Sequence, residues 1–292
     1  LGNKTMSISA ALVKKLRDET GAPMMECKAA LEEASGDYEQ AKDLLREKGK
    51  AAATKRAGRA TSAGRVALAV SSNHQAVGAV VLECETDFVS SNEKFAEIAN
   101  ELAELFLHQA PGADPLSVKK GDKTVAEIIE GAVAVIRENI KLAKAVQLTS
   151  DSNSFATYVH HDNMKAVIVE VEGTPANGHD VGRKVAIQAV AYPGAAFINK
   201  EDIPAEILEK EISIEKARAI ESGKPENIAE NIARGKVNKE YVQQVALLEM
   251  PFYADSSKTV GAFIAEESKA SPVKIVSFHR LAVGEGSDES ED

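Results

Sequence analysis

An acid and an aromatic residue that follow an apolar segment are the residues best suited to act on another molecule. The apolar run Ala76–Leu82 predicts a strand, the segment Thr86–Val89 follows it, and a helix is predicted from about Glu93. A strand-to-helix corner of this kind would present the charge of Asp87 and the bulk of Phe88 together. Because large apolar residues are more often buried than exposed, a core position for Phe88 is the alternative interpretation.

No other arrangement of residues indicates covalent chemistry. The segment 58–65 contains glycines but lacks the Gly-Lys-Ser/Thr ending of a phosphate-binding loop, and no Gly-x-Ser-x-Gly motif occurs. Glu83 and Glu85 share one face of the predicted strand, but such pairs are far more often solvated acids than catalytic groups. His160 and His161 are adjacent strand residues that should point to opposite faces and therefore not bind one metal ion. We predict no enzyme activity, no metal site and no cofactor.

The composition excludes several functional classes. Aromatic residues make up 4% of the 292 residues and Trp is absent, which argues against a nucleic-acid binder built on aromatic stacking. The net charge of −10 argues against a general polyanion binder. Cys27 and Cys84 form neither a disulfide framework nor a metal-binding pattern, which is consistent with a reducing cytoplasm. The sequence contains no run of 18 apolar residues, so no membrane-spanning segment is predicted.

Three short helices are predicted to form a bundle over residues 6–50. Gly21 ends the first helix, Pro23 suits the first turn of the second, and Asp37 begins the third in a capping-box-like arrangement. Residues 51–65 are rich in Lys and Arg and are interpreted as a basic linker. Contact with RNA is the alternative for this segment, but it has no interleaved aromatic residue.

An internal repeat indicates a duplicated core. Residues 79–85 match residues 166–172, and each copy is preceded by a predicted strand and followed by an amphipathic helix. We therefore predict an α+β fold with small antiparallel sheets, its first half at 66–148 and its second at 149–203 and 245–283. The second copy has Gly173-Thr174-Pro175 in place of Thr86-Asp87-Phe88, so the scaffold does not require the latter residues. Residues 124–144 are predicted to be helical.

A charged insert is predicted to interrupt the second half. Residues 204–244 read as two antiparallel helices joined at Gly223-Lys224-Pro225, with Ile228 and Ile232 on the apolar seam of a coiled-coil arm. Residues 284–292 read as a disordered acidic tail. Met6 is a candidate natural start, and whether residues 1–5 are an added segment stays open.

Two segments resemble the motifs of the elongation factor Ts family. They are Leu16–Leu31, which reads LRDETGAPMMECKAAL, and the corner Thr86–Val89. Their order agrees with that family, and the similarity extends over nearly the whole chain. The resemblance implies an N-terminal bundle like a ubiquitin-associated domain, a duplicated α+β core and a coiled-coil arm.

The resemblance also implies a function, namely guanine-nucleotide exchange on elongation factor Tu as the partner. It assigns the corner residues Thr86, Asp87, Phe88 and Val89 to displacement of the partner's magnesium ion. It assigns a contact on the N-terminal bundle to Arg17, Met24, Met25 and Lys28, with a core position as the alternative for Met24. Further partner contacts are assigned to His160, Lys258, Thr259 and Val260. No nucleotide binding by this chain itself is expected, and self-association is left open.

Asn139-Ile140 corresponds to a family pair that has two arginines nearby, but Ala143-Lys144 stand there in this chain, so no role is assigned to it. Two other functional classes remain as alternatives. The bundle alone could recognise ubiquitin-like or nascent-chain ligands, but the corner and the duplicated core would then be unexplained. An enzyme is the other alternative, and no constellation of residues supports it. Only the exchange-factor interpretation predicts that the chain accelerates release of GDP from elongation factor Tu, so this measurement would distinguish it from the other two classes.

Overall fold

The computed structural model describes residues 8–173, 175–269 and 271–285, which fall into two units. Unit 1 comprises the described residues of 1–69, 78–147 and 283–292, and unit 2 those of 70–77 and 148–282. The candidate start at Met6 and most of the predicted acidic tail lie outside the described residues.

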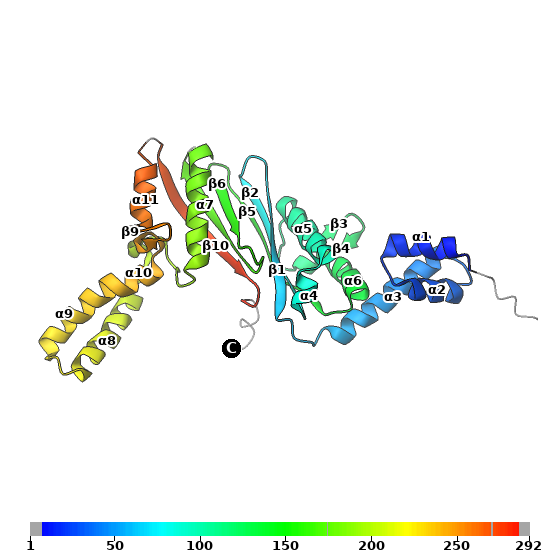
Figure 1. Ribbon diagram of the computed structural model, residues 1–292, viewed down its shortest axis with the longest axis horizontal. Helices are drawn as coiled ribbons and strands as arrows, with labels where there is room; N and C mark the ends of the chain where they lie inside the picture. Colours follow the sequence, from blue (N-terminus) through cyan, green and yellow to red (C-terminus); the bar gives the residue numbers. More distant parts are fainter. Residues whose placement is uncertain (1–7, 174, 270, 286–292) are drawn as a thin grey trace, which may run out of the picture. The chain divides into compact units, whose positions relative to one another are not determined.

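The N-terminal bundle of unit 1 contains the three predicted helices, α1 (Ala10–Thr20), α2 (Met24–Glu33) and α3 (Tyr38–Arg56), seen at the blue end of the chain in Figure 1. Gly21 takes the left-handed conformation that ends α1, with φ 68°. The Asp37 carboxylate accepts a hydrogen bond from the Gln40 amide at 2.9 Å and starts α3. Leu16, Cys27 and Leu31 are fully buried between the helices. The predicted bundle is confirmed.

Helix α3 continues beyond the bundle, and this corrects the predicted basic linker. The helix runs to Arg56 and strand β1 begins at Ala63, so only residues 57–62 join regular elements. Ala51-Ala52-Ala53 favour a helix, and α3 packs closely on helix α6 of the same unit. A Cβ atom added at Gly49 would lie 3.3 Å from the Cβ of Ala134 on α6. One helix thus belongs both to the bundle and to the core.

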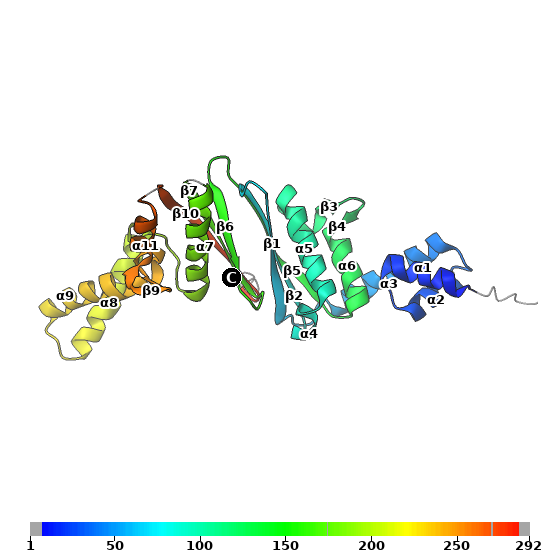
Figure 2. The ribbon, with the colours of Figure 1, turned by 45° about the horizontal axis from the view of Figure 1, so that its top comes forward.

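The core of unit 1 is a three-stranded sheet covered by helices. The strand order is β1-β2-β5, and α5 lies over the sheet in Figures 1 and 2. Phe95, Leu102 and Phe106 of α5 are fully buried, as its apolar spacing predicts. The elements are β1 (Ala63–Val70), β2 (Ala76–Cys84), α4 (Asp87–Ser90), α5 (Glu93–His108), β3 (Lys119–Lys120), β4 (Lys123–Thr124), α6 (Val125–Ile136) and β5 (Ile140–Thr149), with a 3₁₀ turn at Pro115–Ser117.

Unit 2 has a second three-stranded sheet, whose order is β10-β7-β6 with antiparallel neighbours. Helix α7 lies over this sheet in Figures 1 and 2, with Val181 and Val185 fully buried. The elements are β6 (Ser154–Val159), β7 (Lys165–Gly173), α7 (Pro175–Ala191), β8 (Pro251–Phe252), β9 (Asp255–Thr259), α11 (Val260–Glu267) and β10 (Val273–Ala282), with 3₁₀ turns at Lys200–Asp202 and Leu247–Glu249.

The two units repeat one topology, which confirms the predicted duplication. In each, the repeated strand is central: β2 lies between β1 and β5, and β7 lies between β6 and β10. The repeat also extends further than predicted. A short hairpin, β3–β4 or β8–β9, precedes α6 or α11, and both helices begin at the same tripeptide, Lys123-Thr124-Val125 or Lys258-Thr259-Val260.

The helix predicted over residues 124–144 is wrong in its second half. Helix α6 ends at Ile136, Arg137 takes the left-handed conformation with φ 67°, and β5 begins at Ile140. Residues 140–149 complete the sheet next to β2, as β10 completes the second sheet next to β7. Pairing with the central strand overrides the local helical preference of the segment.

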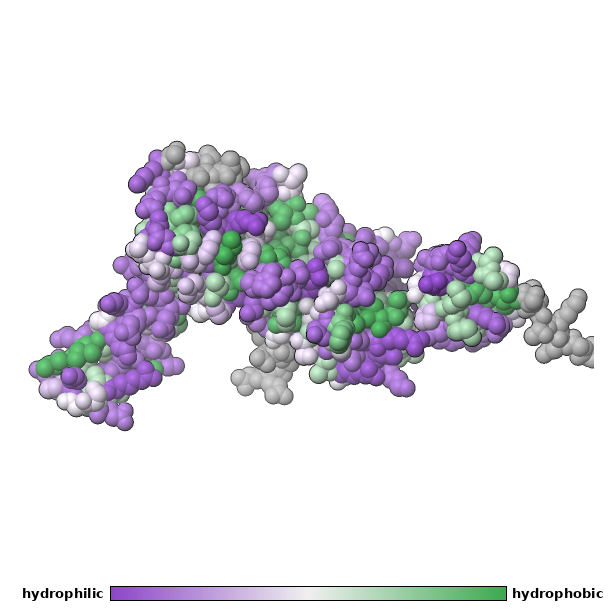
Figure 3. Space-filling view, in the orientation of Figure 1, coloured by the Kyte–Doolittle hydropathy of each residue, from purple (hydrophilic) through white to green (hydrophobic). Residues whose placement is uncertain are grey.

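The arm of unit 2 consists of α8 (Ala205–Glu221) and α9 (Glu226–Lys236), followed by a π-helical turn (Val237–Tyr241) and α10 (Val242–Val245). Its seam differs from the predicted one, because Ala229 and Ala233 are fully buried while Ile228 and Ile232 are exposed. Small residues let the helices approach closely, and ion pairs such as Lys236–Glu215 at 2.7 Å join them. Figure 3 shows the resulting apolar surface on the arm.

Close packing of β2 against α5 gives a first testable prediction. A Cβ atom added at Gly78 would lie 2.2 Å from the Ala103 carbonyl oxygen and the Leu107 nitrogen, both backbone atoms of α5. Gly78→Ala should therefore lower the free energy of unfolding by about 2 kcal/mol or more. As the control, Gly235→Ala places a Cβ in open space within α9 and should stabilise by up to about 1 kcal/mol. Urea unfolding measures both variants, and a neutral Gly78→Ala would contradict the packing.

Candidate functional site

The corner, defined as Thr86–Val89, exposes its aromatic side chain. Phe88 is 85% exposed, and no residue of the single-turn helix α4 is buried. Asp87 beside it is also exposed, whereas Val89 is half-buried and packs against the core. The core interpretation of Phe88 is therefore wrong. The ring is therefore presented to solvent, where it is accessible to another molecule.

Backbone and side-chain hydrogen bonds shape the corner locally. The Thr86 hydroxyl caps α4 by accepting from the Val89 amide at 3.4 Å. The Thr86 carbonyl accepts from the Ser90 amide at 3.2 Å, which closes the turn. Asn92 then caps α5 by accepting from the Lys94 amide at 2.8 Å. Two successive N-caps thus place one short turn between the strand and the long helix.

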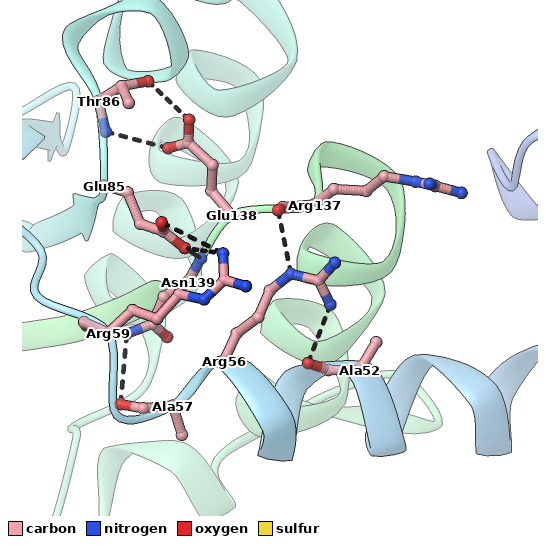
Figure 4. A network of polar contacts seen from close by, with 9 residues as sticks. All are labelled: Ala52, Arg56, Ala57, Arg59, Glu85, Thr86, Arg137, Glu138 and Asn139. Atoms are coloured by element: carbon pink, nitrogen blue, oxygen red, sulfur yellow. Dashed lines mark hydrogen bonds and ion pairs between the residues drawn. The ribbon is translucent and has the colours of Figure 1, made fainter.

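Glu138, two residues after the end of α6, holds the corner from the side. Its carboxylate accepts two hydrogen bonds from Thr86, from the backbone nitrogen at 3.0 Å and from the hydroxyl at 2.6 Å. Figure 4 shows this pair beside a second group around Glu85 and Asn139. Bonds to a charged acceptor are stronger than those between neutral groups. Sequence reasoning missed Glu138 because the segment was predicted as helix.

Glu83, in β2, and Glu85, just after it, are structural rather than solvated, so the interpretation of both as solvated strand acids was wrong. Glu83 is 2% exposed and accepts hydrogen bonds from the Thr61 hydroxyl and the Gly284 amide, both at 3.0 Å. Glu85 accepts from the Asn139 amide at 2.6 Å and lies 3.4 Å from the Arg59 guanidinium. Both acids therefore fix the end of β2 from which the corner projects. The spacing of Glu83 and Glu85, two residues apart at the end of an apolar strand, was the sequence feature that could have indicated this role.

Asn139, to which the sequence assigned no role, is buried and joins three segments. Its side-chain nitrogen donates to the carbonyls of Ala57 at 3.3 Å and Arg59 at 2.7 Å, while its backbone nitrogen donates to Glu85 (Figure 4). The Asn–Ile pair in the sequence was a usable signal despite the missing arginines.

The cysteine nearest the corner is not a nucleophile. Burial, and then the negative charge of Glu138, raises the pKa of the Cys84 thiol to about 12. A thiol that stays protonated near neutral pH is unreactive.

The residues predicted on the bundle lie on its surface. Met25 is 73% exposed and Met24 is 49% exposed, so the core alternative for Met24 is wrong. Lys28 follows them on the next turn of α2, with its ammonium 3.7 Å from Glu32. Arg17 is exposed in the last turn of α1. We call Arg17, Met24, Met25 and Lys28 the bundle patch, and apolar surface on the bundle is visible in Figure 3.

His160 lies in the turn between β6 and β7 of unit 2. Its ring nitrogen Nδ1 is 3.4 Å from the Tyr158 hydroxyl, and its ring centroid is 4.2 Å from that of His161. The two rings thus touch, contrary to the expected opposite orientation. Asn163 closes the turn with φ 58°, which Asn tolerates better than most residues. The turn between β6 and β7 therefore forms with Asn163 in the left-handed conformation.

The last predicted site, Lys258-Thr259-Val260, is explained by the fold. Val260 is fully buried, which corrects its assignment as a contact. The Thr259 hydroxyl caps α11 by accepting from the Ala262 amide at 3.1 Å. Lys258 forms an ion pair with Glu266 at 2.6 Å, and this hydrogen bond raises the pKa of the lysine.

Within the described part of the chain, no group of three His, Cys, Asp or Glu residues is arranged to hold a metal ion. No helix in the same residues has the length and apolar character needed to cross a membrane.

The chain is similar to known proteins over nearly its whole length. A family model described as "Elongation factor TS" matches residues 85–285. Elongation factor Ts of Trichlorobacter lovleyi is 38% identical, over 98% of this chain and 96% of the relative. The proteins of the same name from Brucella anthropi and Clostridium perfringens are 40% and 37% identical, over the same shares of the two chains. The matched model begins next to the corner, and the relatives extend over the bundle as well.

The exposure of Phe88 gives a prediction about stability alone. Phe88→Ala should change the free energy of unfolding by less than about 0.5 kcal/mol, because the side chain makes little contact with the core. Phe95→Ala, the control on the adjoining helix α5, removes a fully buried ring and should cost about 3–5 kcal/mol. Urea unfolding of the two variants measures the difference. Similar losses in both would mean that Phe88 packs as a core residue in solution.

Proposed function

The chain belongs to the elongation factor Ts family, and on this premise we propose that it is the guanine-nucleotide exchange factor of an elongation factor Tu. In this proposal it binds the GDP form of its partner, promotes release of GDP and permits exchange for GTP during translation in the cytoplasm. The proposal includes no covalent step, so the chain acts by binding and not as an enzyme.

Exchange of this kind follows from differential affinity. A protein that binds the nucleotide-free partner more tightly than the nucleotide-bound partner must weaken the partner's affinity for nucleotide. The ratio of the two affinities is the same in both cases. Magnesium ions that bridge a nucleotide and a protein demand near-ideal octahedral geometry, so a small displacement of their ligands is costly. We propose that Asp87 and Phe88 insert near the partner's magnesium and nucleotide site and cause such a displacement.

The exposure of Phe88 is the observation that carries the proposal. At 85% exposure, the ring remains in water on a turn whose backbone is held by hydrogen bonds. A rigid, exposed aromatic residue supplies a large contact area at small entropic cost when it enters a partner's pocket. The corresponding position in the repeat lacks an aromatic residue, which supports a functional rather than a structural reason for Phe88.

The bundle patch supports a second contact in the same proposal. Met25 and Met24 offer exposed apolar surface, with Lys28 one turn away. Methionine side chains adapt readily to a partner surface. This contact would add affinity without touching the nucleotide site. His160 is a further proposed contact in unit 2, whereas Val260 is fully buried and is not part of the proposed interface.

Removal of the Phe88 ring should slow exchange without unfolding the protein. Loss of a buried aromatic contact at an interface costs about 2 kcal/mol or more, which is roughly thirtyfold. We therefore expect Phe88→Ala to slow release of fluorescent GDP from elongation factor Tu by about that factor. Leu116→Ala, which truncates another exposed apolar residue of unit 1, is the control and should release GDP as fast as the wild type. Unchanged release by Phe88→Ala would exclude the corner from the mechanism.

Variants of the bundle patch should affect affinity instead. A truncation would cut α3, which also packs on α6, so side-chain changes give the cleaner test. Met24→Ala combined with Met25→Ala should raise the factor concentration for half-maximal GDP release about tenfold, while saturating factor restores the maximal rate. Met164→Ala, an exposed methionine of unit 2, is the control. A fall in the maximal rate with unchanged half-saturation would contradict the assignment.

A further inference from the structure

Three consecutive residues after α6, Arg137-Glu138-Asn139, contact both the corner and the N-terminal helices, and we call them the junction turn. We propose that Glu138 is a positioning residue, which acts through Thr86 to hold the corner, and that the junction turn joins the corner and the bundle into one rigid surface. The inference rests on the proposed function, because the position of Phe88 matters only if that ring enters a partner.

The first step is the geometry between Glu138 and Thr86. The two carboxylate oxygens bind two different groups of Thr86, Oε2 the backbone nitrogen at 3.0 Å and Oε1 the hydroxyl at 2.6 Å. Two bonds from one carboxylate to one residue restrict both its distance and its orientation. Thr86 immediately precedes Asp87 and Phe88, so its orientation sets the direction of both side chains.

The second step is the lack of hydrophobic support for the corner, whose other contacts are local hydrogen bonds of the turn and one from the Cys84 thiol to the Thr86 carbonyl at 3.2 Å. Helix α4 has no buried residue, and only Val89 packs partly against the core. Hydrophobic burial therefore contributes little to its position. The Thr86 hydroxyl donates to Glu138 while accepting from the Val89 amide, so the cap of α4 and the bond to Glu138 share one group. Loss of Glu138 would loosen both.

The third step is the connection to the bundle. The Arg137 carbonyl accepts from Arg56 Nε at 3.0 Å, at the end of α3 (Figure 4). The Arg137 guanidinium forms an ion pair with Glu26, the residue after Met25 on α2. Asn139 binds the carbonyls of Ala57 and Arg59, just beyond α3. Arg137 thus contacts α2 and the end of α3, and Asn139 contacts the segment that follows α3.

The backbone conformation of Arg137 indicates that its side chain is needed for the contact with α2. With φ 67° the residue takes a conformation that usually selects glycine at the end of a helix. A non-glycine residue is strained in this conformation, because its Cβ lies too close to the backbone. Glycine would relieve that strain but could not reach Glu26. The arginine is therefore explained by its contact with α2.

The test measures position and activity separately. Glu138→Ala removes both bonds to Thr86. Glu138→Gln can keep both, because its amide oxygen accepts from the Thr86 nitrogen and its amide nitrogen donates to the hydroxyl. Asp202→Ala is the matched control, since this carboxylate of unit 2 also accepts two hydrogen bonds from one residue, Asn199. Amide hydrogen exchange of the corner and release of fluorescent GDP are measured for each single variant. Both are also measured for Phe88→Ala and for the double variant that combines Glu138→Ala with Phe88→Ala.

We expect Glu138→Ala to increase amide exchange at residues 86–90 and to lower the maximal rate of GDP release roughly tenfold, with half-saturation unchanged. Glu138→Gln should recover most of that rate, and Asp202→Ala should leave it unchanged. The double variant with Phe88→Ala should be no slower than Phe88→Ala alone, because Glu138 acts through the corner.

Three outcomes would overturn the proposal: an unchanged maximal rate in Glu138→Ala, additive losses in the double variant, or a loss explained wholly by a smaller folded fraction. Failure of the wild type to accelerate GDP release would instead reject the proposed function. Loss of activity in Phe88→Ala together with full activity in Glu138→Ala rejects only the positioning role.

Discussion

A side chain that must stay in water cannot be held by the hydrophobic effect, and this constraint governs the architecture around Phe88. The ring is 85% exposed, and the turn that carries it buries nothing. Polar contacts supply the rigidity instead, with Glu138 on Thr86 and Asn139 on Glu85. These contacts are effective because Glu138 and Asn139 lie in the short connection between α6 and β5, two elements that pack in the core of unit 1. The burial of β2 and α5 thus fixes the position of the corner indirectly, because a few directional hydrogen bonds connect the corner to the packed core.

The duplication separates what the fold requires from what is particular to one unit. Features that occur in both units, such as the central apolar strand and the Lys-Thr-Val start of α6 and α11, have structural explanations in capping and burial. The Thr86-Asp87-Phe88 sequence occurs only in the first copy, and the second copy has Gly173-Thr174-Pro175 at the corresponding positions. Within one chain, the comparison of two copies supplies information that a single unit would lack.

Much of the fold was predictable from local patterns, and the errors have a common cause. The caps at Gly21 and Asp37 and the apolar face around Phe95 depend on nearby residues, so the sequence predicts them directly. The strand at Ile140–Thr149 was missed because its partner, β2, is distant in the sequence. The same reason applies to Glu138, whose partner Thr86 is 52 residues away in the sequence. At the arm, Ile228 and Ile232 were assigned to the seam by hydrophobicity, whereas close approach of α8 and α9 selects the smaller alanines.

The glycine at the contact between β2 and α5 constrains the corner as well as the core. A Cβ atom added at Gly78 would lie 2.2 Å from backbone atoms of Ala103 and Leu107 near the C-terminal end of α5. A larger residue would have to move α5 away from the sheet. Because the corner is the short connection between β2 and α5, such a movement would be transmitted to Phe88 although that ring touches neither Gly78 nor the helix end. A residue chosen for close packing thus also limits how far an exposed side chain can shift.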